Sequence, residues 1–138
     1  MSDAEHWFPS HVRHLAEEEC WEILADHDVG RVAYCDDRGP VVLPVNYSLD
    51  RQAILIRLAP YSRLAVQLED ALASFQIDEY DNFNQSGWSV LLRGKATHVE
   101  TAAPSAEGDQ PFPWAEGERS LLVRITPDEI TGRRLLPA

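Results

Sequence analysis

Three residues near the middle of the chain have the types and spacing of an anion site. Arg57 ends an apolar run, and Ser62 is a good helix N-cap followed at once by Arg63. Guanidinium groups supply charged donors, and the N–H groups at a helix start add a favourable dipole. The stretch therefore predicts a phosphate-like ligand. The alternative is that Arg57 is a surface arginine paired with one of the many carboxylates.

A proline lies inside the strand-like run that precedes this stretch. The run 41–45 is rich in β-branched and aliphatic residues, yet Pro44 cannot donate a hydrogen bond to a neighbouring strand. The strand is therefore predicted to be an edge, a bulge, or a place where something other than a strand is paired. Asn46 is unusual in a strand, and it either caps a bulge or bonds a ligand.

These residues must be positioned by a mainly β chain with two short helices. The pattern predicts helices at 15–25 and 62–70, and strands at 31–35, 41–45, 53–57, 72–77, 86–99 and 120–126. Gly94 predicts a bend or bulge, and Gly132 predicts a turn in the tail. Residues 78–85 are expected to form an acidic connection and residues 102–117 a loop. Strands in hairpin order pair antiparallel, and a small sheet of this kind commonly closes into a barrel.

Composition limits the class of protein. The 138 residues fit one domain, here residues 15–138 after an N-terminal arm at 1–14. The net charge of −11, from 23 acidic against 12 basic residues, argues against general nucleic-acid binding and against anionic membrane surfaces. No apolar run is long enough to span a membrane, and no secretion signal is evident, so we expect a cytoplasmic protein.

The remaining chemically capable side chains give weaker signals. The two cysteines form neither a disulfide framework nor a zinc site, and Cys35 is expected to be a buried small residue. His27 is expected at a solvated helix end and His98 at an exposed strand end. Trp88 is either core, interface or a ligand contact. No metal site is predicted, and no side chain is assigned as a general acid or base.

Several motifs, taken in order, resemble a known family. They are Leu43–Tyr47 (LPVNY), Arg57, Tyr61–Leu64 (YSRL) and Ser86–Gly94 (SGWSVLLRG), supported by Val29–Ala33 and Ile130–Arg134. Together they resemble the small single-domain members of the pyridoxamine 5′-phosphate oxidase-like, FMN-binding split-barrel family. The resemblance covers nearly all of residues 13–136. It implies a mainly β fold with short helices, built as a six-stranded antiparallel split β-barrel of the FMN-binding type.

The resemblance also implies a homodimer with FMN between the subunits and a small-molecule substrate. The implied cofactor-binding positions are Leu43, Pro44, Val45, Asn46, Arg57, Ser62, Arg63, Trp88 and Ser89. The first four would lie along the flavin ring. Arg57 would lie near the phosphate and ribityl chain, and Ser62 and Arg63 would hold the phosphate. Trp88 and Ser89 would lie at the ring or ribityl chain, from the partner subunit in one arrangement. Arg133 and Arg134 would reach across the dimer.

Two departures bear on function. Tyr61 stands where the family pattern has a small residue, and the residues that grip pyridoxal phosphate in the true oxidases are not recognisable. The sequence therefore predicts an FMN-dependent oxidoreductase acting on an unidentified small molecule. One alternative is an F420-dependent reductase of the same fold, which is disfavoured because few bases are available for a polyanionic tail. Another is a non-catalytic module that binds flavin or haem.

Overall fold

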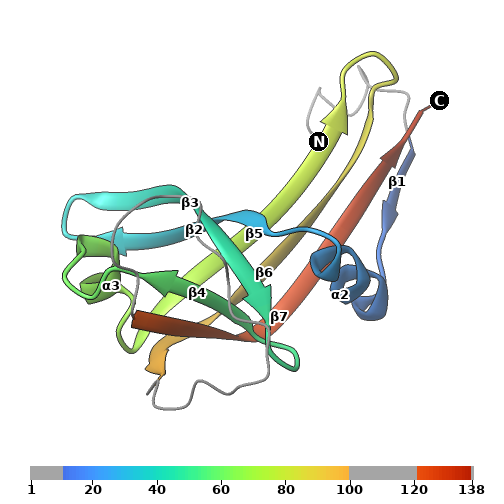
Figure 1. Ribbon diagram of the computed structural model, residues 1–138. Helices are drawn as coiled ribbons and strands as arrows, with labels where there is room; N and C mark the ends of the chain where they lie inside the picture. The colour runs from blue at the N-terminus through green and yellow to red at the C-terminus, as the bar shows by residue number, and fades with distance from the viewer. Residues whose placement is uncertain (1–10, 100–120, 138) are drawn as a thin grey trace.

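The computed structural model describes residues 11–99 and 121–137, and within them the chain is mainly β (Figure 1). The two helices are α2 (Glu17–Ala25) and α3 (Arg63–Gln67). The strands are β1 (His11–His14), β2 (Val29–Asp36), β3 (Gly39–Leu49), β4 (Ile54–Leu58), β5 (Ala71–Asp81), β6 (Ser86–Val99) and β7 (Leu121–Leu136). Neither of these helices is long and apolar enough to cross a membrane.

Six of the strands close into a ring. The sheet runs in the order β1-β7-β4-β3-β2-β5-β6, and β6 pairs with β7 to complete the circuit. Every pairing is antiparallel. The prediction of a mainly β, six-stranded antiparallel barrel is confirmed, with β1 as an additional strand on the outer side of β7.

Alternation of apolar and polar residues decides which face of each strand is inside. Val32, Phe75 and Val90 are fully buried from three neighbouring strands, while their neighbours in sequence are partly or wholly exposed. This period of two is what a barrel with one solvated face requires. Cys20 and Leu24 of α2 belong to the same core, so this helix packs against the inner face of the sheet.

Three strands continue past the barrel into an extension. We use this name for residues 78–89 of the β5–β6 hairpin together with 131–136 of β7, which β1 borders (Figure 1). The predicted connection 78–85 is therefore wrong in part, since β5 runs to Asp81 and only the tip turns. The polar residues of this segment were interpreted as a loop. Strands that extend beyond the core can carry polar side chains on both faces, so polarity did not distinguish a loop from a strand here.

The tail does not turn at Gly132, as the sequence had suggested. β7 runs straight through it, and a Cβ at this position would lie 2.6 Å from the Cys20 sulfur. Glycine is needed there for the close approach of α2 to β7, and a turn plays no part. By contrast, the bulge predicted at Gly94 is confirmed, since the β6–β7 register shifts between Arg93 and Gly94.

Other local predictions held with changed bounds. Helix 15–25 is found as Glu17–Ala25, and the helix predicted at 62–70 is shorter, at Arg63–Gln67. Part of the predicted N-terminal arm, His11–His14, is a strand, while residues 1–10 and the predicted loop 102–117 lie outside the described residues.

Candidate functional site

Among the described residues, β3 and β4 separate beyond a short paired stretch, and we call the place where they separate the opening. Their pairing covers only Tyr47–Leu49 of β3 and Ile54–Ile56 of β4, although β3 begins at Gly39. Continuing the register by one step would set Arg57 opposite Asn46. The residues predicted for the ring end and the first residue predicted for the phosphate end therefore lie on the two sides of one opening.

Pro44 lies on the uncovered side of β3. The Tyr47 N–H donates toward β2, to the Asp28 carbonyl at 3.0 Å. Because successive main-chain groups alternate in direction, those of Pro44 and Val42 point away from β2, where no described strand pairs with them. The missing N–H of Pro44 thus removes no ladder bond, and the edge alternative for this proline is confirmed.

The uncovered segment also carries exposed apolar side chains. Val42 is 58% and Leu43 is 37% exposed, and Pro44 is exposed as well, whereas Val45 packs against the core. A short β edge with apolar side chains, whose main-chain groups pair with no described strand, can take a flat ligand along its length.

The start of α3 is capped by Ser62, as predicted. Its hydroxyl accepts from the Ala65 N–H at 3.1 Å and donates to the Ala59 carbonyl at 2.8 Å. Because that donation uses the hydroxyl proton, the groups left to meet an anion are the first-turn N–H groups of Arg63 and Leu64, which helix hydrogen bonds do not use. Ser62 therefore shapes the cap.

The two arginines of the predicted phosphate end differ in burial. Arg57 is half-buried on the outer face of β4, because Ile54, Ile56 and Leu58 take the inner positions. Arg63, the first residue of α3, is exposed. In sequence, Arg57 lies just before the turn at 59–62 and Arg63 lies just after it. The Ser62 N–H closes this turn by donating to the Ala59 carbonyl at 3.0 Å.

Tyr47 anchors β3 next to the opening. Its buried hydroxyl donates to the Leu24 carbonyl at 2.7 Å, and burial raises the pKa of this phenol well above its usual range. The side-chain amide of Asn46 reaches the Asp28 carbonyl at 3.5 Å. β3 is thus tied to the end of α2 on the side away from its uncovered edge, which fixes the position of that edge.

Trp88 and Ser89 lie elsewhere in the same chain. They belong to β6, which is separated from β3 by β2 and β5, so three strand spacings of about 4.8 Å place them roughly 14 Å away. Successive strand residues face opposite ways, so they also point to different sides. Ser89 shares the outer face with Pro44, while Trp88 packs against His27, with ring centroids 4.9 Å apart.

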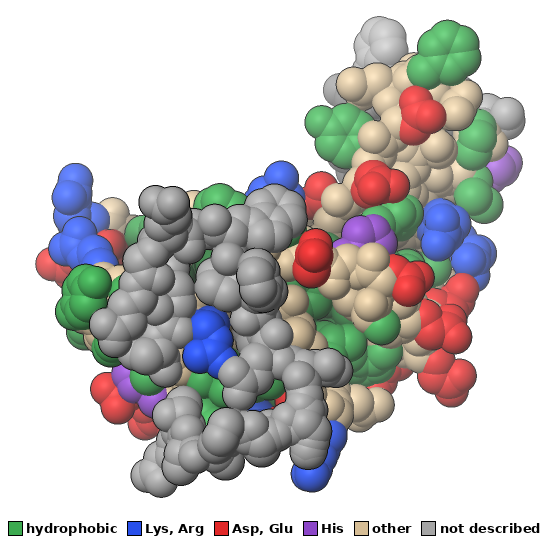
Figure 2. Space-filling view, viewed as in Figure 1, with side chains coloured by type: hydrophobic (Ala, Val, Ile, Leu, Met, Phe, Trp, Pro, Cys, Tyr) green, Lys and Arg blue, Asp and Glu red, His purple; other side chains and the backbone are tan. Residues whose placement is uncertain are grey.

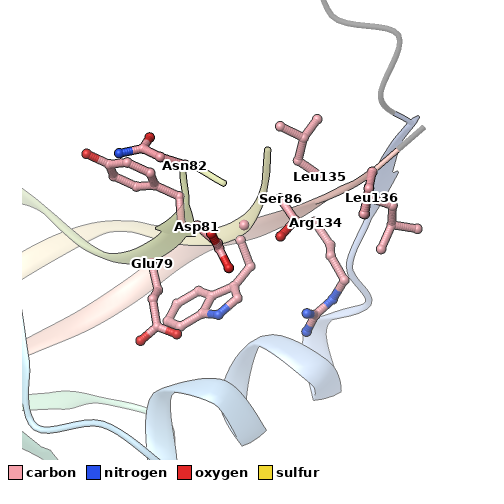
Figure 3. A pocket seen from close by; sticks show the side chains of 11 residues that line it. Glu79, Asp81, Asn82, Ser86, Arg134, Leu135 and Leu136 are labelled. Atoms are coloured by element: carbon pink, nitrogen blue, oxygen red, sulfur yellow. The ribbon is translucent and has the colours of Figure 1, made fainter. Parts of the chain in front are cut away.

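Trp88 lines a pocket on the extension. It has a volume of about 710 Å³ and lies among residues from β5, β6 and the end of β7. Glu79 and Arg134 are the cross-strand partners of Trp88, and in Figure 3 both point toward α2 while Leu135 points the opposite way. Arg133, the neighbour of Arg134, is exposed on the outer face.

A charged network that the sequence did not reveal lies on the outer face of β2 and β5. The Asp78 carboxylate accepts from Arg31 and from Gln76, both at 3.0 Å and both on the same oxygen. Register places Arg31 beside Pro44 and also beside Gln76, while Asp78 lies beside Ser89. All are on the outer face. Only the pairing of distant strands brings them together, so no local motif could have identified them.

Two minor predictions were wrong. Cys35 is exposed, because Val32 and Tyr34 take the inner positions of β2 and the alternation turns Cys35 outward. His98 is half-buried and joins β6 to α3, with its Nε2 2.8 Å from the Ala65 carbonyl. His27 is exposed at the end of α2, as expected. The described residues hold no group of three or more His, Cys, Asp or Glu that would bind a metal.

Comparisons with known proteins agree with this architecture. The family model described as pyridoxamine 5′-phosphate oxidase matches residues 16–134. A Corynebacterium glutamicum structure, named as a candidate pyridoxamine 5′-phosphate oxidase, is 31% identical with a TM-score of 0.76. The match covers 92% of this chain and 95% of that one.

Two further relatives extend the comparison. The structure of an FAD binding protein from Mycobacterium smegmatis is 28% identical, with a TM-score of 0.70 and coverage of 90% of this chain and 98% of that one. An uncharacterized Mycobacterium tuberculosis protein, Rv0080, is 26% identical over 131 residues, which is 91% of this chain and 86% of that protein.

Proposed function

The chain belongs to the pyridoxamine 5′-phosphate oxidase family, and from that premise we propose that it binds a flavin at the opening between β3 and β4. The observation that carries the proposal is the uncovered edge of β3 at Pro44, which continues toward Arg57 and the capped start of α3. A flat, hydrogen-bonding ring and a phosphate need these two kinds of surface side by side.

The residues present fit both parts of a flavin nucleotide. The main-chain groups of Val42 and Pro44 offer in-plane hydrogen bonds to a ring edge, and exposed Leu43 offers apolar contact. Arg57, Arg63 and the first-turn N–H groups of α3 offer donors and positive charge for a phosphate. On a chain of net charge −11, such a local cationic site favours binding of an anion at this place.

The flavin, when bound, supplies electron transfer, and the protein supplies binding, orientation and electrostatics. We therefore propose an FMN-dependent oxidoreductase that acts on a small molecule. The similar protein from Mycobacterium smegmatis is named for FAD, and FAD contains the whole of FMN, so the site for ring and first phosphate is the same for both. F420 ranks lower because a chain of net charge −11 with 12 basic residues has few bases for a polyanionic tail.

We further propose that two copies of the chain complete the site. Within one chain Trp88 and Ser89 lie about 14 Å from Pro44, so they reach the ring only from a second subunit. The extension has the surface for such an association. Among its exposed side chains Tyr80 is 71%, Phe83 is 93% and Leu136 is 38% exposed, and Figure 2 shows hydrophobic side chains gathered at its far end.

A binding experiment tests the proposal. The purified protein is titrated with FMN, FAD and F420, with visible absorbance and flavin fluorescence as readouts. We expect FMN or FAD to bind more tightly than F420. An Arg57→Ala, Arg63→Ala double variant should weaken flavin binding by tenfold or more, because a hydrogen bond to a charged group contributes about 1.5–3 kcal/mol and 1.4 kcal/mol is tenfold.

The matched control is Arg51→Ala, which removes an exposed arginine in the β3–β4 turn, at the end where the two strands pair. It should leave flavin affinity unchanged. A double variant that binds FMN as tightly as the parent would show that the phosphate site is elsewhere, and a parent that binds no flavin would exclude the proposed function.

A further inference from the structure

The pairing of β3 with β4 is one of the shortest in the ring of strands. These two strands pair only over Tyr47–Leu49 and Ile54–Ile56, whereas β4 pairs with β7 along its whole length. The opening proposed as the flavin site begins directly beyond this paired stretch. The separation of β3 from β4 at the opening therefore depends on the few residues of the paired end.

The turn that closes this paired end is strained. Asp50 and Ala53 exchange both main-chain hydrogen bonds, at 3.0 and 3.1 Å, so only Arg51 and Gln52 lie in the loop. Gln52 has a φ of 113°, a conformation that glycine adopts readily and that residues with a side chain rarely adopt. Two-residue hairpin loops favour asparagine and glycine for this reason. The turn by itself is therefore a weak constraint on the two strands.

An ion pair from a third strand holds the same turn. The Arg124 guanidinium of β7 donates to the Asp50 carboxylate, and their side chains are 37% and 35% exposed. Arg124 is the register partner of Leu55 on β4, and Leu55 is the partner of Ser48 on β3. The Arg124 side chain thus crosses β4 to reach the end of β3. Among the ion pairs of the described residues, it is the only one that joins two strands with a third strand between them.

We propose that Arg124 and Asp50 form a clamp that sets the separation of β3 from β4 at the flavin site. The inference rests on the proposed function, in which the ring lies along β3 and the phosphate lies near Arg57 of β4. A site whose two sides have the required separation for only part of the time binds with an affinity reduced by that fraction. Neither partner of the clamp needs to touch the flavin, so both are positioning residues.

Two substitutions remove the clamp with opposite changes of charge. Arg124→Met keeps an unbranched side chain but removes the donors and the positive charge, and Asp50→Ala removes the carboxylate. We expect each to weaken FMN binding by about two- to fivefold, because fivefold corresponds to about 1 kcal/mol, the most that such an ion pair typically contributes. A direct effect of charge on the phosphate would instead weaken binding in Arg124→Met and strengthen it in Asp50→Ala. The double variant should lose no more than either single variant, because both remove the same contact.

A glycine in the turn should replace the clamp. Gln52→Gly relieves the strained conformation, so it should restore most of the FMN affinity in the Arg124→Met background and change little in the parent. A role in stability alone would lower the free energy of unfolding in urea and leave FMN affinity unchanged. Arg51→Ala is the matched control, because it removes an arginine of the same turn that takes no part in the ion pair, and it should leave FMN affinity unchanged.

The experiment titrates the parent and the variants with FMN, followed by flavin fluorescence, and measures their unfolding in urea. Weaker binding in both single variants, no further loss in the double variant and recovery with Gln52→Gly support the clamp. Unchanged affinities, shifts of opposite sign in the two single variants, or a loss that Gln52→Gly leaves in place overturn it while flavin binding stands. A parent that binds neither FMN nor FAD overturns the proposed function and this inference together.

Discussion

Replacing Gly132 by alanine tests whether β7 runs straight beneath α2. The added Cβ would lie 2.6 Å from the Cys20 sulfur and 3.0 Å from Leu15 Cδ1. Both neighbours are buried, with Cys20 at 0% exposure, so neither can move aside into solvent. Overpacking of this kind typically costs about 1–3 kcal/mol, and we expect Gly132→Ala to lower the free energy of unfolding by that amount.

A second substitution shows whether the clash with Cys20 is the cause. Cys20→Ala removes the sulfur and should cost about 1 kcal/mol by itself, similar to deletion of one buried methyl group. In the double variant the new Cβ occupies the vacated space, so the combined loss should be smaller than the sum by about 1 kcal/mol or more, a coupling typical of residues in contact.

Urea unfolding followed by tryptophan fluorescence measures these differences, provided that the denaturant dependence stays the same in all variants. If Gly132 instead occupied a left-handed turn, Gly132→Ala would still be destabilising, but Cys20→Ala would not compensate for it. Strictly additive losses would therefore refute the packing explanation, as would a neutral Gly132→Ala.

Substitutions at three other residues test the cap, a buried hydrogen bond and the extension. Tyr47→Phe should lower stability by about 1–3 kcal/mol through its lost bond to the Leu24 carbonyl. Because burial raises the pKa of Tyr47, the parent alone should lose additional stability above about pH 10, the unfolded value, as unfolding curves at pH 8 and 11 would reveal. Ser62→Ala should cost about 1 kcal/mol but Ser62→Gly only a few tenths, measured by thermal melting, as expected for an N-cap. Phe83→Ser, at the tip of the extension, should weaken self-association in light scattering if the extension contacts a second subunit, whereas equal association would argue against that contact.

The strands could be predicted where the alternation of apolar and polar residues and the turn-forming residues are visible in a short stretch of sequence. β6 was predicted with its observed bounds, and the irregularity in its pairing at Gly94, where β7 has one extra residue, was predicted from that glycine alone. Prediction of local structure failed where one residue type is compatible with two different structures. Glycine permits a turn but also permits close packing, and only the position of α2 shows that Gly132 does the second. Acidic residues mark loops in a compact core, but in the extension they lie on a paired ribbon.

The candidate site divides in the same way. Pro44 and Ser62 can be recognised locally, one by its missing donor and the other as a helix cap. Ser62 was predicted correctly as the N-cap, and for Pro44 the edge was one of three predicted alternatives. The positions of all nine predicted cofactor contacts relative to a flavin stay a prediction. The network of Arg31, Gln76 and Asp78 was missed because 47 positions separate Arg31 from its carboxylate partner. Such a contact depends on the β2–β5 register, which no local pattern specifies.

The opening itself follows from unequal strand lengths. β3 has 11 residues and β4 has 5, so β4 can cover only one end of β3 before the turn at Pro60 leads the chain into α3. An uncovered apolar edge is a liability, because it can pair with the edge of another chain. Proline at the uncovered position removes one donor and reduces that risk without cost to the pairing with β2. Protection of the edge alone would be served equally well by an exposed lysine. Three features distinguish this edge. Its side chains are apolar, its position is fixed by the hydrogen bond from the Tyr47 hydroxyl to the Leu24 carbonyl, and two arginines lie close to it in sequence. This combination is what the proposed flavin site requires, because a ligand that covers the edge would satisfy its main-chain groups and place its phosphate near the two arginines.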